Sequence, residues 1–213
     1  MRVSILRDGT AQRPYLRLLR WYFSEGAFLV TATGQSVPLS EVVVEAGMGV
    51  LDTFAFNEDL PFTFPNGCQA AEIEIDPETG LVDLLRYIAV DDYGNLVNPM
   101  LTEGQVHGGL VQGIGQALGE NCIYEEENGQ LLTGSMMDYW LPRASQIPIL
   151  EVHLEGIPTK VNPLGVKGSG QAGCICAPQT IVHAVLDALS PLGIDDIDMP
   201  VTSEKIWRAI TSA

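Results

Sequence analysis

Amide and glycine residues share one side of a segment in the middle of the chain. At about 100° per residue, a helix through Gly104–Glu120 would group these polar and small residues in one stripe. The members of the stripe are Gln105, Gln112, Gln116, Gly108, Gly109 and Gly115. Amides both donate and accept hydrogen bonds, so the stripe suits a flat polar ligand lying against the helix.

The same stripe has a second explanation. Each interior glycine costs a helix up to about 1 kcal/mol relative to alanine, so some gain has to offset that cost. Close packing of the glycines against another helix, with the amides in solvent, would also give a stabilisation that offsets this cost. Spacing alone leaves both explanations open.

A second candidate site lies in the segment Asn162–Gly173, which has four glycines in nine residues. Backbone N–H groups of such a loop can bind an anion, helped by the dipole of a following helix that we expect to begin at Pro178. The segment lacks the G-K-[ST] ending of a nucleotide phosphate loop. Gly168–Gly173 has the spacing of the dinucleotide fingerprint, but that fingerprint must directly follow a strand.

Other residues that could do chemistry have weaker sequence support. His107 lies toward the apolar side of the expected helix, which favours a hydrogen-bonded core imidazole over a catalytic role. Cys174 and Cys176 form a C-x-C pair with no second pair or nearby histidine, so we expect thiols and no zinc site.

Hydrophobic periodicity predicts an α+β fold of mixed sheets with packed helices to position these segments. Apolar residues alternate with glutamates up to Ile75, a turn is expected at Asp76–Gly80, and a second strand at Leu81–Asp91, giving a β-hairpin with one wet face. The remaining predicted elements are helices at Tyr15–Phe23, Leu39–Ala46 and Pro178–Leu189, a strand at Leu150–Leu154, and a last helix capped by Thr202 or Ser203 and ending near Ile210.

Composition narrows the class of partner. The 213 residues are 46% hydrophobic, enough for a buried core, and carry a net charge of -16. That charge gives no electrostatic footprint for nucleic acid or an anionic membrane. No apolar run reaches the roughly 18 residues of a membrane span, so we expect a cytoplasmic protein with protein or small-molecule partners.

Several separated motifs together resemble the molybdenum hydroxylases, the family of xanthine dehydrogenase, aldehyde oxidoreductase and aerobic carbon monoxide dehydrogenase. The motifs are GQVHGG from Gly104 with Gln112-Gly113, Thr133-Gly134-Ser135 with Asp138-Tyr139, and Asn162–Gly173. Their order and spacing match the C-terminal part of the molybdopterin-binding large subunit, from about Pro65 to Ile210. The resemblance implies the fold of that subunit's second molybdopterin-binding domain.

The resemblance also implies a cofactor site. The family holds molybdenum through a pterin dithiolene, often as the cytosine dinucleotide in bacteria, so the protein supplies few or no metal ligands. Gln105 would approach the metal's oxo group, and Lys167–Gly170 would present their backbone to the metal end. The implied cofactor-binding residues are Gln105, Gly108, Gly109, Gln112, Gly113, Ser135, Lys167, Gly168, Ser169 and Gly170.

The family hydroxylates an aldehyde or a carbon beside a ring nitrogen, and a carboxylate after the last glycine of the K-G-x-G motif acts as the base. Here that position holds Gln171. A primary amide has no useful basicity, so general-base catalysis worth roughly 10²–10⁴-fold is expected to be absent. Impaired hydroxylation follows.

The family pattern predicts partners as well. Residues 1–64 are expected to be an incomplete N-terminal segment that packs on a missing part of the large subunit, and residues 65–213 the C-terminal molybdopterin-binding domain. An iron–sulfur subunit with [2Fe-2S] clusters and a flavin subunit with FAD would carry the electrons away. The alternative is a non-catalytic fragment or interaction module that keeps the fold without cofactor.

Overall fold

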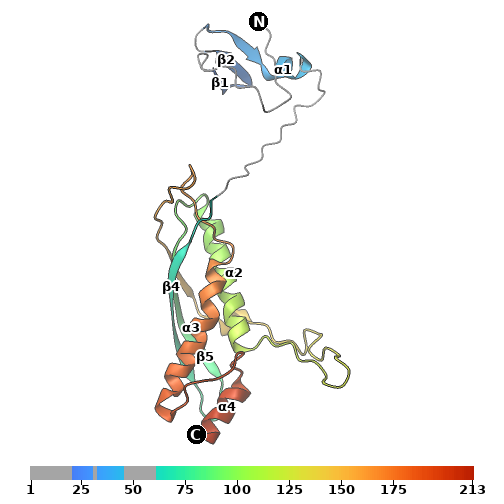
Figure 1. Ribbon diagram of the computed structural model, residues 1–213, viewed down its shortest axis with the longest axis vertical. Coiled ribbons are helices and arrows are strands. Elements are labelled where there is room, and N and C mark those ends of the chain that lie inside the picture. The colour runs from blue at the N-terminus through green and yellow to red at the C-terminus, as the bar shows by residue number, and fades with distance from the viewer. Residues whose placement is uncertain (1–20, 31–32, 46–60) are drawn as a thin grey trace. The chain divides into compact units, whose positions relative to one another are not determined.

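The computed structural model describes residues 21–30, 33–45 and 61–213 (Figure 1). The chain divides into two compact units, Met1–Glu58 and Asp59–Ala213. Each unit is described by itself.

The described part of the first unit is a small antiparallel sheet followed by a short helix. Strands β1 (Trp21–Ser24), β2 (Ala27–Val30) and β3 (Ser36–Pro38) lie in the order β1-β2-β3. Glu25 and Gly26 both have positive φ, 49° and 76°, as in the tight turns that match the twist of a hairpin. Helix α1 (Leu39–Glu45) confirms the helix expected there.

The helix predicted over Tyr15–Phe23 is wrong where the structure describes it. Trp21 and Phe23 belong to strand β1, whereas residues 15–20 lie outside the described residues. Consecutive aromatic residues favour a pleated strand, and the turn that follows directly stabilises the hairpin.

The second unit is built on a three-stranded mixed sheet. Strands β4 (Asn66–Ile75) and β5 (Val82–Asp92) pair antiparallel, and β6 (Leu150–Leu154) pairs parallel to β5, with Tyr87 opposite Leu150. The predicted hairpin and the last strand are confirmed. In the turn between β4 and β5, the carboxylate of Asp76 accepts hydrogen bonds from the Glu78 N–H and the Thr79 hydroxyl.

Both long helices begin earlier than the sequence indicated. Helix α2 (Pro99–Leu118) starts at Pro99, because the Asn98 side chain accepts from the Leu101 N–H at 3.1 Å and caps the helix. Helix α3 (Ala172–Leu189) starts six residues before Pro178, the predicted first residue, and holds that proline inside it.

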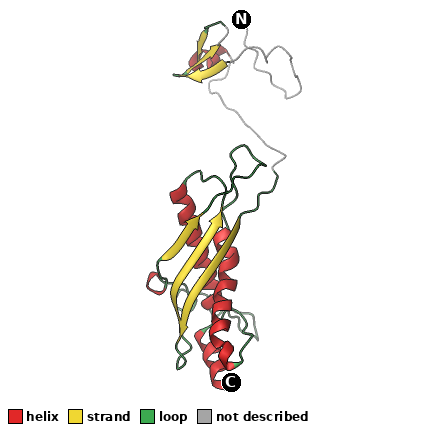
Figure 2. Ribbon diagram, turned by 90° about the vertical axis from the view of Figure 1, so that its left-hand side faces the viewer, coloured by secondary structure: helices red, strands yellow, loops and turns green. Residues whose placement is uncertain are grey.

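Helices α2 and α3 cover one face of the sheet, as Figure 2 shows. Side chains of β5, α2 and α3 form the core between these layers. Its fully buried members include Tyr87, Ala89, Val106, Leu110, Ile114, Ala177 and Ile181. The apolar side predicted for the middle helix therefore lies against the sheet.

A second cluster of buried residues lies around the C-terminal helix. Val185 and Leu189 of α3 pack with Val201 and with Ile206 of α4 (Ser203–Ser212). The Thr202 hydroxyl accepts from the Lys205 N–H at 3.4 Å, which confirms the predicted cap. Two 3₁₀ turns complete the described elements, at Ala144–Gln146 and Ser190–Leu192.

One helix region has the length and composition of a membrane span, although the sequence shows no unbroken apolar run of that length. It covers Ala172–Leu192, with mean hydropathy 1.4. One third of this apolar window is buried within the unit, including Ile181 and Val185.

Candidate functional site

The two segments singled out by residue type meet in the structure. The Gln105 side-chain Nε2 on α2 donates to the Gly170 carbonyl at 2.7 Å, across 65 residues of chain. Gln105 and Gly170 are both exposed. The N-terminal half of α2 and the glycine-rich loop before α3 therefore lie side by side at one end of the unit (Figure 1).

Four of the five glycines of α2 fall into two groups; the fifth, Gly115, is buried, and a Cβ added there would come within 2.7 Å of the Pro142 Cγ. A Cβ atom added at Gly104 or Gly108 would meet no atom within 4 Å beyond the adjacent backbone of its own helix. A Cβ at Gly113 would come within 2.5 Å of the Ala177 Cβ, and one at Gly109 within 3.0 Å of the Cys174 backbone nitrogen. Packing against α3 is sufficient to explain the second pair.

This division answers part of the question left open by spacing. Close helix packing accounts for Gly109 and Gly113, whose role as cofactor contacts stays a prediction. Gln112, one turn from the open Gly108, and Gln116, two turns from it, are exposed. A polar surface with uncovered backbone thus remains on the outer side of the helix.

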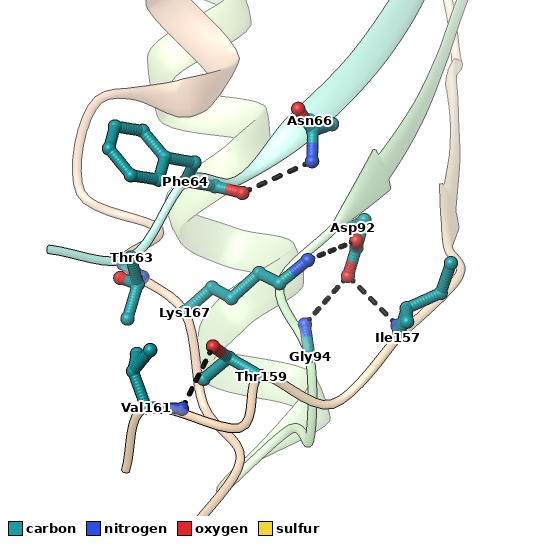
Figure 3. Close-up of polar contacts among 10 residues, drawn as sticks. Thr63, Phe64, Asn66, Asp92, Gly94, Ile157, Thr159, Val161 and Lys167 are labelled. Carbon is teal, nitrogen blue, oxygen red and sulfur yellow. Dashed lines mark hydrogen bonds and ion pairs between the residues drawn. The ribbon is translucent and has the colours of Figure 1, made fainter.

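Lys167 uses both its backbone and its side chain within the protein. Its backbone N–H donates to the Tyr93 carbonyl at 2.9 Å. Its ammonium group pairs with the Asp92 carboxylate, which also accepts from the N–H groups of Gly94 and Ile157 at 2.9 Å each (Figure 3). The Lys167 ammonium and these backbone N–H groups hold the pKa of Asp92 low, at about 2.

The next residues of the loop are held more loosely. The Gly168 N–H donates to the Thr63 hydroxyl at 3.2 Å, and the backbone of both Gly168 and Gly170 has open space where a Cβ would lie. Ser169 is half-buried and makes no side-chain hydrogen bond within residues 61–213.

Gln171 is the N-cap of α3. Its carbonyl accepts from the N–H groups of Cys174 and Ile175, at 2.9 and 3.1 Å. Its side chain is exposed and makes no hydrogen bond in the part of the chain that the structure describes. The amide is thus free to contact a group bound beside Gly170.

The fingerprint of dinucleotide-binding proteins does not fit this loop. Strand β6 ends at Leu154, well before Gly168, and between them Val166 forms only an isolated bridge with Gly94. The required direct passage from strand to loop to helix is missing.

A polar pair beneath the start of α3 carries no sequence motif. The Gln69 Nε2 donates to the Gly173 carbonyl at 3.3 Å, and its Oε1 accepts from the Tyr87 hydroxyl at 2.6 Å. Burial raises the pKa of Tyr87, so the phenol stays protonated as a donor. The alternation around Gln69 in strand β4 was the available signal, since a polar residue on an inward position needs a partner.

A buried carboxyl lies one residue before Asp92. Asp91 is 4% exposed and accepts from the Tyr93 hydroxyl at 3.0 Å. Burial raises the pKa of Asp91, with the hydrogen bond from Tyr93 opposing it. Gly67 leaves room for it, because a Cβ there would lie 2.0 Å from an Asp91 oxygen and would force that carboxyl to shift.

Ser135 is not brought together with the other candidates. Its hydroxyl donates to Asp138 at 2.6 Å, within the segment that follows the C-terminal end of α2 and extends away from the sheet in Figure 1. Gln105 lies about 20 Å from that end, at 1.5 Å per helical residue. The role of Ser135 in cofactor binding stays a prediction.

The expectation for His107 is wrong in one respect. The imidazole is half-buried on α2, but its Nε2 is buried without a hydrogen-bond partner among the described residues. A lone buried acceptor or donor of this kind lowers stability, and we find no contact that offsets it.

Comparison with known proteins identifies what this arrangement resembles. The sequence profile of the family described as "Molybdopterin cofactor-binding domain" matches residues 18–148. The large subunit of nicotine 6-hydroxylase from Paenarthrobacter nicotinovorans is 40% identical over 161 residues, covering 76% of this chain and 20% of the relative. The carbon monoxide dehydrogenase large chain of Hydrogenophaga pseudoflava is 36% identical over 160 residues, covering 75% and 20%.

Solved structures agree with these sequence matches. A Cu,Mo-dependent carbon monoxide dehydrogenase superposes with a TM-score of 0.73 at 28% identity, covering 90% of this chain and 25% of that one. Quinoline 2-oxidoreductase from Pseudomonas putida 86 gives 0.69 at 34% identity, covering 90% and 26%. The α+β fold expected from the sequence is confirmed, and the chain spans about a fifth of the length of the curated relatives it matches.

Proposed function

Because this chain belongs to the molybdopterin cofactor-binding family of molybdenum hydroxylase large subunits, we propose that it forms part of the cofactor site of such an enzyme. The proposed reaction is oxidative hydroxylation of an aldehyde or of a carbon beside a ring nitrogen in a small-molecule substrate. The hydrogen bond between Gln105 and Gly170 carries the proposal, because it joins the amide helix to the glycine-rich loop.

The residues present fit a flat polar group. Gly108 on α2 and Gly168 and Gly170 on the loop leave backbone uncovered, and Gln105 and Gln112 offer amides beside them. These residues would hold the pterin by hydrogen bonds and close backbone contact. When bound, the molybdenum cofactor supplies the two-electron oxidation, and the chain supplies orientation.

Gln171 limits what this chain can do at the reacting atoms. An amide at the N-cap of α3 can donate or accept a hydrogen bond but cannot hold a proton taken from a reacting group. The positive end of the helix dipole beside it would favour a carboxylate there, had one been present. Binding and orientation therefore remain, whereas proton transfer by this residue does not.

The proposed assembly includes other chains. Relatives are named as large subunits or as a subunit of a dehydrogenase complex. On that basis we propose partners that are the remaining part of a large subunit, an iron–sulfur subunit with [2Fe-2S] clusters and a flavin subunit with FAD. The cofactor would be the cytosine dinucleotide form, and the assembly cytoplasmic.

The test is to express the chain together with these partner parts in a host that makes the molybdenum cofactor. We expect molybdenum and released cytosine nucleotide in about equal amounts in the purified complex. Gln171→Glu should raise hydroxylation turnover by roughly 10²–10⁴-fold without changing the molybdenum content.

A matched control is Gln179→Glu, the same substitution at another exposed position of α3. It should leave turnover unchanged. Full molybdenum content with no gain from Gln171→Glu would defeat the assignment of this position.

The second candidate function is a non-catalytic module that keeps the fold. The observation in its favour is the amide at position 171. Absence of both molybdenum and nucleotide from the assembled complex would support the module and reject the cofactor site.

A further inference from the structure

We propose that Asp92 is the positioning residue of the glycine-rich loop, and that its ion pair with Lys167 fixes residues 168–171 beside α2 and the start of α3. The inference deepens the proposed function and rests on it for its biological meaning. The contacts that carry it involve only described residues of this chain (Figure 3).

Asp92 joins three separate segments. It is the last residue of β5, its Oδ1 accepts from the Gly94 and Ile157 N–H groups at 2.9 Å each, and its Oδ2 pairs with the Lys167 ammonium. The side chains of Asp92 and Lys167 are 15% and 11% exposed. A single carboxylate thus ties the end of the sheet to the stretch after β6 and to the loop.

The ion pair lies where the loop changes character. Residues up to Lys167 are held by backbone bonds, with the Gly165 carbonyl accepting from the Asn95 N–H at 3.0 Å and Lys167 donating to Tyr93 at 2.9 Å. Beyond Lys167, exposed Gly168 and Gly170 each make one hydrogen bond to another segment in the described chain. Lys167 is therefore the last residue before Gln171 that is held by both its backbone and its side chain.

Burial makes the pair sensitive to the loss of one partner. Removing one charge from a shielded pair leaves the other without compensation, which costs much more than breaking an exposed pair. The Lys167 ammonium would have to move toward water, and the residues after it would move with it. We expect the consequence at residues 168–171 and not in the sheet.

Asp92→Asn separates this role from simple turn formation. The amide oxygen can still accept from Gly94 and Ile157, but the charge that holds Lys167 is gone. Asp92→Ala removes both functions. Amide exchange at Gly94 and Ile157 should be faster in Asp92→Ala than in Asp92→Asn, whereas exchange in the loop should be equally fast in both variants.

The experiment is hydrogen–deuterium exchange on the full chain without cofactor. Asp92→Asn should speed exchange of the hydrogen-bonded amides of Gly168, Cys174 and Ile175 by about tenfold or more, while β4 and β5 keep the protection of the unmodified chain. Glu151→Gln, which breaks the exposed Arg86–Glu151 pair, should leave the loop unchanged.

Lys167→Met tests the pair from the other side, in case the carboxylate variant fails to fold. It should reproduce the loop effect, and Lys167→Arg should restore most of the protection because the charge returns. Unchanged exchange in the loop for both charge-removing variants overturns the proposal. So does loss of protection throughout the sheet in both, since that would make the pair a general stabiliser.

The role of the Asp92–Lys167 pair and the proposed cofactor binding can be disproved separately. Exchange is measured without cofactor, so it reports on the loop whether or not the chain binds molybdenum. The molybdenum content of the assembled complex reports on the function in a separate experiment.

Discussion

Two sets of glycines on one helix serve opposite purposes. Gly109 and Gly113 of α2 lie against α3, where an added Cβ would meet atoms within 3.0 and 2.5 Å. Gly104 and Gly108 face open space. The first pair allows two helices to approach closely, and the second leaves backbone uncovered on the outer side of α2, where Gly108 belongs to the proposed cofactor surface.

The difference teaches that glycine content alone does not locate a binding surface. The glycines of the packed seam are part of the fold, and their effect appears in the free energy of unfolding. The glycines of the open surface cost stability, and their benefit can appear only when something binds. Substitutions that act on one region and not on the other test this division.

The largest expected effect on stability is in the core next to the contact between α2 and α3. Leu110 is fully buried on α2, so Leu110→Ala should lower the free energy of unfolding by about 2–5 kcal/mol through lost burial and the cavity left behind. Chemical denaturation measures it. Leu101→Ala, at a 65% exposed position of the same helix, is the control and should change stability little.

Gly113→Ala comes next. Its methyl group would lie 2.5 Å from the Ala177 Cβ and 2.9 Å from the Pro178 Cδ. Overpacking costs about 1–3 kcal/mol, and a gain of up to about 1 kcal/mol in helix propensity offsets part of it. We expect a lower midpoint in thermal unfolding, and a raised midpoint would contradict the close packing of α2 on α3.

Gly108→Ala should act in the opposite direction. No atom beyond the adjacent backbone of α2 lies within 4 Å of the added methyl group, so better helix propensity should raise the free energy of unfolding by about 0.5–1 kcal/mol. The same methyl group would obstruct the proposed cofactor surface. The free energy of unfolding of the chain should therefore rise, while the molybdenum content of the complex should fall. Unchanged molybdenum content would show that Gly108 is not part of the cofactor site.

The smallest expected effect belongs to the exposed Arg86–Glu151 pair, which lies in neither region. The guanidinium of Arg86 lowers the pKa of Glu151 from its ordinary value of 4.5. A lowered pKa contributes stability above that value, and the contribution is lost as the pH falls below it. The difference in thermal midpoint between the unmodified chain and Glu151→Gln should be small at neutral pH and vanish in acid. A difference in thermal midpoint that grows in acid would contradict the predicted pH dependence of stability.

Local patterns predicted local structure well. The turn at Asp76–Gly80 and the strand Leu150–Leu154 follow from turn residues and alternation, and both are present. The start of α2 also had a local signal, Asn98 followed by Pro99, that the periodicity of later residues concealed. Pro178 led to a wrong helix start, because proline is common in the first turn of a helix but here lies inside α3.

The candidate site residues could be named from the sequence, but their contacts could not. Gln105 and Gly170 could be singled out by type and spacing, whereas their hydrogen bond joins positions far apart in the chain. The pairing of Asp92 with Lys167 left no pattern, because Asp92 looks like an ordinary surface charge and Lys167 was singled out only for its backbone. Contacts of this kind depend on how the sheet and helices pack, which local propensity does not encode.

The parallel pairing of β5 with β6 has a consequence for the order of folding. The β4–β5 hairpin needs only a short turn and can form early, while β6 must wait for the long intervening chain to return, since distant contacts carry a larger loop-closure cost. Asp92 at the end of β5 receives Ile157 and Lys167 only after β6 has docked. The proposed cofactor surface would therefore be completed after the β4–β5 hairpin that supports it has formed.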